Sequence, residues 1–164
     1  MTEKTVTVPT REEILIKREF NAPRALVWKA WTEPEHFKKW WGPKTVVCNV
    51  AKMDVRVGGK YLWSMQGEGW GEIFTGGVFL EVVPIERLVY TDSFADEAGN
   101  IVSPAHYKMP SDFPEKMIVT VILEDLGNKT RMTLQHVGAL ALEMSEMTEK
   151  SWNESFDKLG DSLH

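Results

Sequence analysis

The sequence predicts an α+β protein in which an antiparallel sheet of about six to seven strands curves around one long C-terminal helix. Strand-like segments follow one another between residues 46 and 137, and most are joined by short turn signals. Residues 140–163 then show an amphipathic helical pattern of roughly 24 residues, about 36 Å long, which is enough to cross a whole sheet. Two short helical patterns near the N-terminus complete the order. A single α+β layer is the economical arrangement of these elements.

The chain begins with one strand and a first short helix. Residues 14–20 (Ile-Leu-Ile-Lys-Arg-Glu-Phe) have a strand pattern, and Asn21 is expected to cap the helix that follows, with Pro23 in its first turn. The apolar residues of this helix recur at helical spacing: Leu26, Val27, Ala30 and Trp31.

A second short helix is expected directly afterwards. Thr32 can cap it and Pro34 stands at its start. Phe37, Trp40 and Trp41 are expected to form its apolar side, and Gly42-Pro43 to end it. Trp31 and Phe37 are expected to close one end of the core. Adjacent helical residues point about 100° apart, so one ring of the Trp40-Trp41 pair can reach the rim.

The middle of the chain is rich in strand patterns. Turn signals stand at Gly58-Gly59, at Pro84 and at Gly127-Asn128, and Gly67 to Gly71 also has the composition of a hairpin turn. The expected strands are 46–53, 60–65, 73–83, 87–91, 116–123 and 130–137. Residues 117–123 are almost continuously apolar, as in a strand that is central or covered on both sides.

One segment does not fit this scheme. Residues 92–115 contain three prolines, show no clear period and are longer than most connections in compact domains. The segment also carries Phe94, Tyr107, Met109 and Phe113, which are too many apolar anchors for a disordered stretch. We therefore expect a packed loop over one edge of the fold, which can serve as a lid.

Length and composition predict one globular domain and exclude several classes of protein. The chain has 164 residues, of which 43% are hydrophobic and 26% charged, so residues 1–164 are expected to form one domain with its core from about residue 13. The net charge of −5 is opposite to the basic stripe of a general nucleic-acid binder. No apolar run is long enough for a membrane span, and the N-terminal residues lack the apolar region of a secretory signal. Cys48 is the only cysteine, which fits a cytoplasmic location.

No motif in the sequence requires catalysis, a metal or a cofactor. The four histidines (His36, His106, His136 and His164) form no helical metal-binding pair, and Cys48 has no second thiol to complete a zinc site. Gly58-Gly59-Lys60 lacks the spacing of a phosphate loop, and no Gly-x-Ser-x-Gly motif is present. Cys48 is expected to be a buried, inert thiol. No cofactor is therefore expected.

Large apolar side chains are abundant: the chain has seven Trp, seven Phe and eight Met. One interpretation is an ordinary core. The other is a cavity between sheet and long helix, because methionine-rich walls adapt to varied ligands. Period-two alternation places Tyr61, Trp63 and Met65 on one face of their strand, and Phe74, Val78, Leu80 and Val82 on one face of the next.

Five stretches, in order and spacing, resemble the activator-of-Hsp90-ATPase homologue family of the START-like superfamily. They are FNAPRALVWKAWTEPEHFKKWWGP, DVRVGGKYLWSM, GGVFLEVVPIERLVYTDSF, KTRMTLQHVG and SWNESFDKLGDSL. The resemblance covers nearly the whole chain from about Glu13. It implies a helix-grip fold, in which a curved antiparallel sheet grasps a long C-terminal helix and two short helices close one end. Many proteins of this fold bind lipids, hormones or polyketides between helix and sheet.

Three functions remain open at this point. The preferred one is non-enzymatic binding of a small hydrophobic or amphipathic ligand, and the resemblance also implies a regulator of an Hsp90-type chaperone, with Trp40-Trp41 beside Lys38 and Lys39 as its contact patch. The third is a cyclase-like or hydrolase-like enzyme with His136 or a buried carboxylate as its acid–base group. The candidate ligand-binding residues are Trp40, Trp41 and His136, together with seven that the resemblance implies to face the cavity: Trp63, Met65, Phe74, Leu80, Met132, Leu134 and Trp152.

Overall fold

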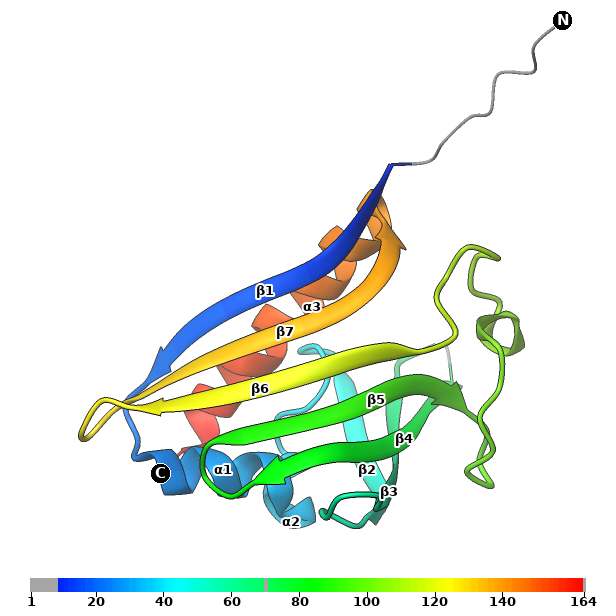
Figure 1. The fold of residues 1–164 in the computed structure, drawn as a ribbon. Helices are drawn as coiled ribbons and strands as arrows, with labels where there is room; N and C mark the ends of the chain where they lie inside the picture. Colours follow the sequence, from blue (N-terminus) through cyan, green and yellow to red (C-terminus); the bar gives the residue numbers. More distant parts are fainter. Residues whose placement is uncertain (1–8, 70, 164) are drawn as a thin grey trace, which may run out of the picture.

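The protein is built on a seven-stranded antiparallel sheet that curves around one long helix (Figure 1). The computed structural model describes residues 9–69 and 71–163. The strands are β1 (Thr10–Phe20), β2 (Val46–Met53), β3 (Lys60–Gly67), β4 (Gly71–Val83), β5 (Arg87–Ala95), β6 (Met117–Asp125) and β7 (Thr130–Ala141). Their order in the sheet is β1-β7-β6-β5-β4-β3-β2. Register shifts in the β1–β7, β2–β3 and β4–β5 pairs are β-bulges or irregularities of the kind that help a sheet to bend.

Three α-helices and a 3₁₀ turn complete the fold. The long helix α3 (Leu142–Ser162) lies across one face of the sheet, and its C-terminal end comes close to α1 (Arg24–Thr32) and α2 (Pro34–Phe37) (Figure 1). This arrangement confirms the predicted helix-grip architecture. None of the helices in residues 9–163 that the structure describes is long and apolar enough to cross a membrane. The predicted domain also included residues 1–8, 70 and 164, which lie outside the described residues.

The two predicted side-chain helix caps are wrong. The N-cap of α1 is Pro23, not Asn21, and the Pro23 carbonyl oxygen accepts from Leu26 N at 3.0 Å. The N-cap of α2 is Glu33, not Thr32. Thr32 still belongs to α1, where its hydroxyl donates to the carbonyl oxygen of Trp28 at 2.8 Å. Its side chain is therefore engaged in the preceding helix and cannot cap the next one.

Trp40 and Trp41 follow α2 and are not part of it. The helix ends at Phe37, and the next residues form turns in which the amides of both tryptophans contact the Phe37 carbonyl. Trp40 folds back onto α1, where its Nε1 donates to the carbonyl oxygen of Ala30 at 2.8 Å. This contact replaces the predicted continuation of the helix.

The predicted inward position of Phe74 and Leu80 on β4 is also wrong, whereas Val82, which alternation grouped with them, packs against the core. Phe79 is fully buried, whereas Leu80 is 43% exposed and Phe74 is only partly buried on the opposite face from Thr75. Simple alternation fails here because a bulge between Phe79 and Glu81 interrupts the pairing of β4 with β5. Bulges leave no clear mark in the hydrophobic pattern, so the sequence favoured the wrong set.

The long connection after β5 is a packed loop, as predicted. It contains a 3₁₀ turn, Pro104–Tyr107, and the hydroxyl of Tyr107 donates to the carbonyl oxygen of Ala95 at 2.6 Å. The ring of Phe94 lies 5.5 Å from that of Tyr107 and 5.4 Å from that of Phe113. These aromatic contacts hold the loop against the end of the sheet opposite α1 (Figure 1).

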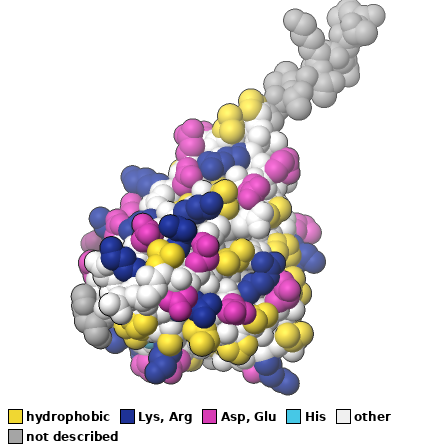
Figure 2. Space-filling model, turned by 60° about the vertical axis from the view of Figure 1, so that its left-hand side comes forward, with side chains coloured by type: hydrophobic (Ala, Val, Ile, Leu, Met, Phe, Trp, Pro, Cys, Tyr) yellow, Lys and Arg dark blue, Asp and Glu magenta, His cyan; other side chains and the backbone are white. Residues whose placement is uncertain are grey.

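The surface carries both signs of charge. Lys and Arg side chains alternate with Asp and Glu over the face shown in Figure 2, without a large region of one sign. Several of these charges form exposed ion pairs, such as that between Arg87 Nε and Glu81 Oε2 at 3.1 Å. Pairs of this kind contribute at most about 1 kcal/mol each to stability. The fold is therefore held mainly by its interior.

Candidate functional site

A pocket of about 270 Å³ lies between α3 and the sheet. We call it the helix–sheet pocket. Its lining comes from α3, from strands β3 to β7, from the loop after β5 and from the turn after α2. The large side chains that line it are Trp41, Met65, Ile73, Phe94, Met109, Phe113, Met117, Met144, Met147 and Trp152. Five of these ten are methionines, whose flexible thioethers can adjust to the shape of a bound molecule.

Two titratable side chains, His136 on β7 and Asp92 on β5, interrupt this apolar lining. The His136 side chain is 4% exposed, and its Nε2 lies 3.5 Å from Oδ2 of Asp92, whose side chain is 21% exposed. This distance fits a loose ion pair if the ring is protonated, but His136 Nε2 has no hydrogen-bond partner among the described residues. A buried ring N–H without a partner is uncommon in folded proteins. This pair supplies the titratable groups of the lining, and its other polar residues are serines and threonines.

The other ring nitrogen of His136 has a defined partner. Trp152 on α3 is 8% exposed, and its Nε1 donates to His136 Nδ1 at 3.0 Å. Because an indole nitrogen can only donate, Nδ1 must be the acceptor and the proton of the neutral ring is on Nε2. The long helix thus fixes the orientation and the tautomer of a histidine on the sheet.

The ten candidate ligand-binding residues separate into three groups. Trp41, Met65, His136 and Trp152 line the helix–sheet pocket. Trp40, Trp63, Met132 and Leu134 are buried in the core, with 1% exposure or less, and are not among its lining residues. Phe74 and Leu80 do not line the pocket either, because β4 presents Ile73 and Thr75 to it instead. The structure therefore brings four of the ten together.

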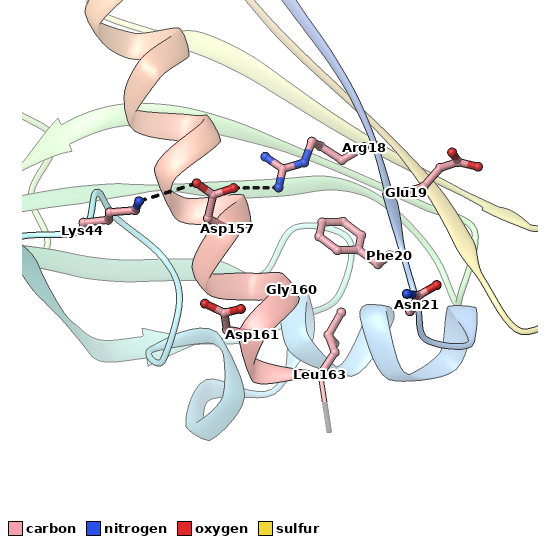
Figure 3. A pocket seen from close by; sticks show the side chains of 9 residues that line it. All are labelled: Arg18, Glu19, Phe20, Asn21, Lys44, Asp157, Gly160, Asp161 and Leu163. Carbon is pink, nitrogen blue, oxygen red and sulfur yellow. Dashed lines mark hydrogen bonds and ion pairs between the residues drawn. The ribbon is translucent and has the colours of Figure 1, made fainter.

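A second, larger hollow of about 700 Å³ lies between the end of β1 and the C-terminal turns of α3 (Figure 3). Five of its nine lining residues are charged, and three of these, Arg18, Lys44 and Asp157, pair with one another. Asp157 Oδ1 lies 2.8 Å from a guanidinium nitrogen of Arg18, and Asp157 Oδ2 lies 3.8 Å from Lys44 Nζ. Because these groups are partly exposed and already paired, their contacts with a ligand would add little binding energy beyond their contacts with water. The helix–sheet pocket is the better candidate site.

The exposed tryptophan patch predicted for a chaperone contact is not formed. Trp40 is fully buried and Trp41 is 7% exposed, while Lys38 and Lys39 stand beside them on the surface. Of the two rings, only that of Trp41 lines the pocket.

Comparison with known proteins assigns the family. The family model described as "Activator of Hsp90 ATPase homolog 1-like protein" matches residues 21–164. The chain belongs to this family. No curated protein matches it. Among solved structures, it is similar to a protein from Chromobacterium violaceum, with 28% identity, a TM-score of 0.77 and coverage of 93% of this chain and 96% of that one.

Two further bacterial structures are similarly close in sequence and fold to this member of the activator of Hsp90 ATPase homologue 1-like family. A protein from Arthrobacter aurescens has 27% identity, a TM-score of 0.78 and coverage of 96% of this chain and 92% of that one. A protein from Nitrosomonas europaea has 26% identity, a TM-score of 0.75 and coverage of 93% and 94%. The fold is therefore shared over almost the full length of each chain.

Sequence reasoning missed Asp92 as a site residue of this family member. The sequence pattern predicts that the strand ends at Thr91 and that Asp92 belongs to the following loop, whereas β5 continues to Ala95. Period-two alternation from buried Tyr90 would have placed Asp92 and Phe94 on the same face of β5. In register, Asp92 pairs with Met117 on β6, one strand away from β7. Only the pairing of β5 with β6 and of β6 with β7 brings the Asp92 carboxylate near His136.

The buried thiol and phenols predict an alkaline loss of stability. Burial raises the pKa of Cys48 from 9.0 to about 12, and burial first, then the charge of Asp92, raises the pKa of Tyr61 and Tyr90 well above 10.0. Above about pH 9 the unfolded chain releases protons that the folded protein retains, so the free energy of unfolding should fall as pH rises toward 12.

Urea denaturation at a series of pH values measures this fall, and Cys48→Val should reduce its slope between pH 9 and pH 10. Iodoacetamide at about pH 8 should alkylate Cys48 in unfolded protein and leave the native thiol unmodified. Equal alkylation rates in the native and unfolded states would contradict the burial of Cys48.

Proposed function

We propose that the protein binds a small apolar or amphipathic molecule in the helix–sheet pocket, as a binding protein and not as a catalyst. The observation that carries this proposal is the pocket's methionine-rich and aromatic lining between α3 and the sheet. Such walls bind by removing apolar surface from water, at about 25 cal/mol per Å². A lone buried cysteine supports a cytoplasmic location for this activity.

The pocket's size narrows the choice of ligand. Its volume of about 270 Å³ is close to the lower end of the range of about 300–1,000 Å³ for drug-sized ligands. It exceeds the cavity of about 150 Å³ that accepts benzene in another protein. The volume favours a substituted one-ring or two-ring molecule or a medium-length aliphatic chain, and it is small for a complete two-chain lipid.

A thermal-shift panel of such compounds tests the proposal. A ligand at 100 times its dissociation constant should stabilise the protein by about 2.7 kcal/mol. Ser151→Phe places a ring in the pocket, because Ser151 lines it, and should abolish the shift. Lys150→Phe adds the same ring one residue away on the exposed side of α3 and should leave the shift intact. If no compound stabilises the protein and native mass spectrometry finds no co-purified molecule, the proposal fails.

Catalysis in the same pocket is the second candidate. The observation that favours it is the His136–Asp92 pair in the lining, since a histidine beside a carboxylate is a frequent acid–base arrangement. The described lining contains no cysteine, and its hydroxyls include those of Thr148 and Ser155, which donate to carbonyl oxygens of α3. Mass spectrometry of a bound compound after long incubation separates the two candidates: binding alone returns it unchanged, and catalysis yields a product.

The family description also suggests a contact with an Hsp90-type chaperone. Of the four side chains that the sequence suggested for this contact, Trp40 and Trp41 are buried. Lys38 and Lys39 are exposed and remain as candidates for it. A pull-down with the host's Hsp90-type ATPase and an ATPase assay test this alternative. Lys38→Glu together with Lys39→Glu should then abolish the interaction without affecting ligand binding.

A further inference from the structure

We propose that the helix–sheet pocket selects a ligand with a hydroxyl group, which accepts a hydrogen bond from His136 Nε2 and donates one to Asp92 Oδ2. This inference rests on the ligand-binding function proposed above and names the chemical class of the ligand: an alcohol or phenol with an otherwise apolar body.

His136 and Asp92 both belong to the lining of the pocket, and Nε2 of His136 is a buried atom that a ligand oxygen reaches only if neighbouring side chains shift. Trp152 engages His136 Nδ1, so Nε2 carries the proton of the neutral ring and has no partner among the described residues. No side-chain hydrogen bond from a described residue reaches the Asp92 carboxylate, and its ion-pair contact among these residues is with His136 Nε2 at 3.5 Å. One buried donor and one acceptor therefore border an apolar cavity together.

The distance between His136 Nε2 and Asp92 Oδ2 suits one bridging atom. Two atoms 3.5 Å apart are too far for a good hydrogen bond, yet one oxygen can lie about 2.8–2.9 Å from both. That oxygen must accept from His136 and donate to Asp92, and a hydroxyl does both. An ammonium group has no lone pair to accept from Nε2–H, and a carboxylate would place its charge against that of Asp92.

Two of the three hydroxyls that α3 contributes to the lining are occupied within the helix, whereas that of Ser151 has no hydrogen bond among the described residues. The hydroxyls of Thr148 and Ser155 donate to the carbonyl oxygens of Met144 and Ser151, at 2.8 and 3.0 Å. The rest of the lining is mainly methionine and aromatic. A single hydroxyl at one end of an apolar molecule matches this distribution better than several polar groups do.

Four probes with nearly the same body test the inference on the wild-type protein: p-cymene, thymol, thymol methyl ether and p-isopropylbenzoate. Thymol is p-cymene with one hydroxyl; its methyl ether can accept but not donate, and the benzoate is an anion. A wholly apolar wall would favour p-cymene, because burying an unpaired hydroxyl is unfavourable. The proposed bridge reverses this order. Water can occupy the same position, so we expect a net preference for thymol of about tenfold or more by calorimetric titration.

Asp92→Leu replaces the carboxylate by an apolar group of similar size and should restore the preference for p-cymene. Asp161→Leu is the matched control, since Asp161 is an exposed residue of α3 outside this pocket, and it should keep the preference for thymol. Nitrogen-15 spectra of the imidazole should show the Nε2-protonated tautomer, with a shift of the Nε2 resonance on addition of thymol but not of p-cymene.

The outcomes separate the two proposals. Thymol preferred in wild type, with the preference reversed in Asp92→Leu, supports the inference. If p-cymene and thymol bind equally, or if the methyl ether binds as tightly as thymol, the hydroxyl bridge is overturned and ligand binding stands. Preferred binding of the benzoate also overturns it. If none of the four probes binds at its solubility limit, the hydroxyl bridge is overturned, and the ligand-binding proposal is decided separately by the wider compound panel and native mass spectrometry.

Discussion

Replacing Trp40 by alanine is expected to lower the free energy of unfolding by about 3–5 kcal/mol. The ring of Trp40 is fully buried, and its centroid lies 4.7 Å from that of Trp31 and 5.2 Å from that of Phe37. Its Nε1 donates to the Ala30 carbonyl oxygen at 2.8 Å, so truncation leaves a buried acceptor unpaired as well as a cavity. Both losses fall at the end of the fold where α1 and α2 meet the core.

Trp41→Ala is the matched comparison and should cost less, no more than about 2–3 kcal/mol. Trp41 is 7% exposed and lines the helix–sheet pocket, so its removal enlarges a cavity that is already present. Its ring stacks on Phe37 with 5.7 Å between centroids, but none of the hydrogen bonds among the described residues involves its indole nitrogen. The loss should appear instead as weaker ligand binding.

Urea denaturation of the two variants measures the difference. Equal, large losses would show that Trp41 is core and not a pocket wall, which would remove one side of the proposed site. A small loss for Trp40→Ala would contradict its burial between Trp31 and Phe37. The short helix and its exit thus contain one ring that closes the core and one that borders the cavity.

The order of elements was predictable because each one bears its own local pattern. In β7, Met132, Leu134 and His136 alternate with more exposed residues and are buried, so the sequence could place His136 inside before any register was known. The C-terminal helix was equally clear, and its start differs from the prediction by two residues because β7 extends to Ala141 in pairing with β1.

The parts of the site that the sequence missed depend on contacts between distant elements. Simple alternation along β4 puts Leu80 on the same face as Val82, because the pattern takes no account of the bulge after Phe79. Asp92 was missed because a carboxylate usually marks the end of a strand. Its role depends on its place two residues along β5 from Tyr90, which lies across β6 from His136. Met109 and Phe113 had been recognised as anchors of the loop, but the pattern could not say that they face the same pocket as Met144.

The second large effect is expected at Gly77, where alanine should destabilise the protein by about 3–5 kcal/mol. A methyl group added at Gly77 would overlap the carbonyl oxygen of Thr91 on β5 and lie 2.5 Å from its Oγ1. Both atoms already hold strands together. The Thr91 carbonyl accepts from the hydroxyl of Tyr61 on β3 at 2.5 Å, and Thr91 Oγ1 accepts from Val78 N on β4 at 2.9 Å. Because the overlap is with backbone, no side-chain rotation relieves it.

Gly160→Ala is the control, with the same chemical change and the opposite expected sign. Gly160 lies in α3, and an added methyl would meet only Phe20 Cδ1 at 3.6 Å and Cε1 at 3.7 Å, which is ordinary contact. Alanine in a helix should therefore stabilise the protein by about 0.5–1 kcal/mol. Free energies from urea denaturation compare the two variants directly. Because Thr91 precedes Asp92, a Gly77→Ala protein that still folds should also lose its preference for thymol over p-cymene. If the variant keeps both its stability and this preference, β4 can move away from Thr91 without disturbing the pocket.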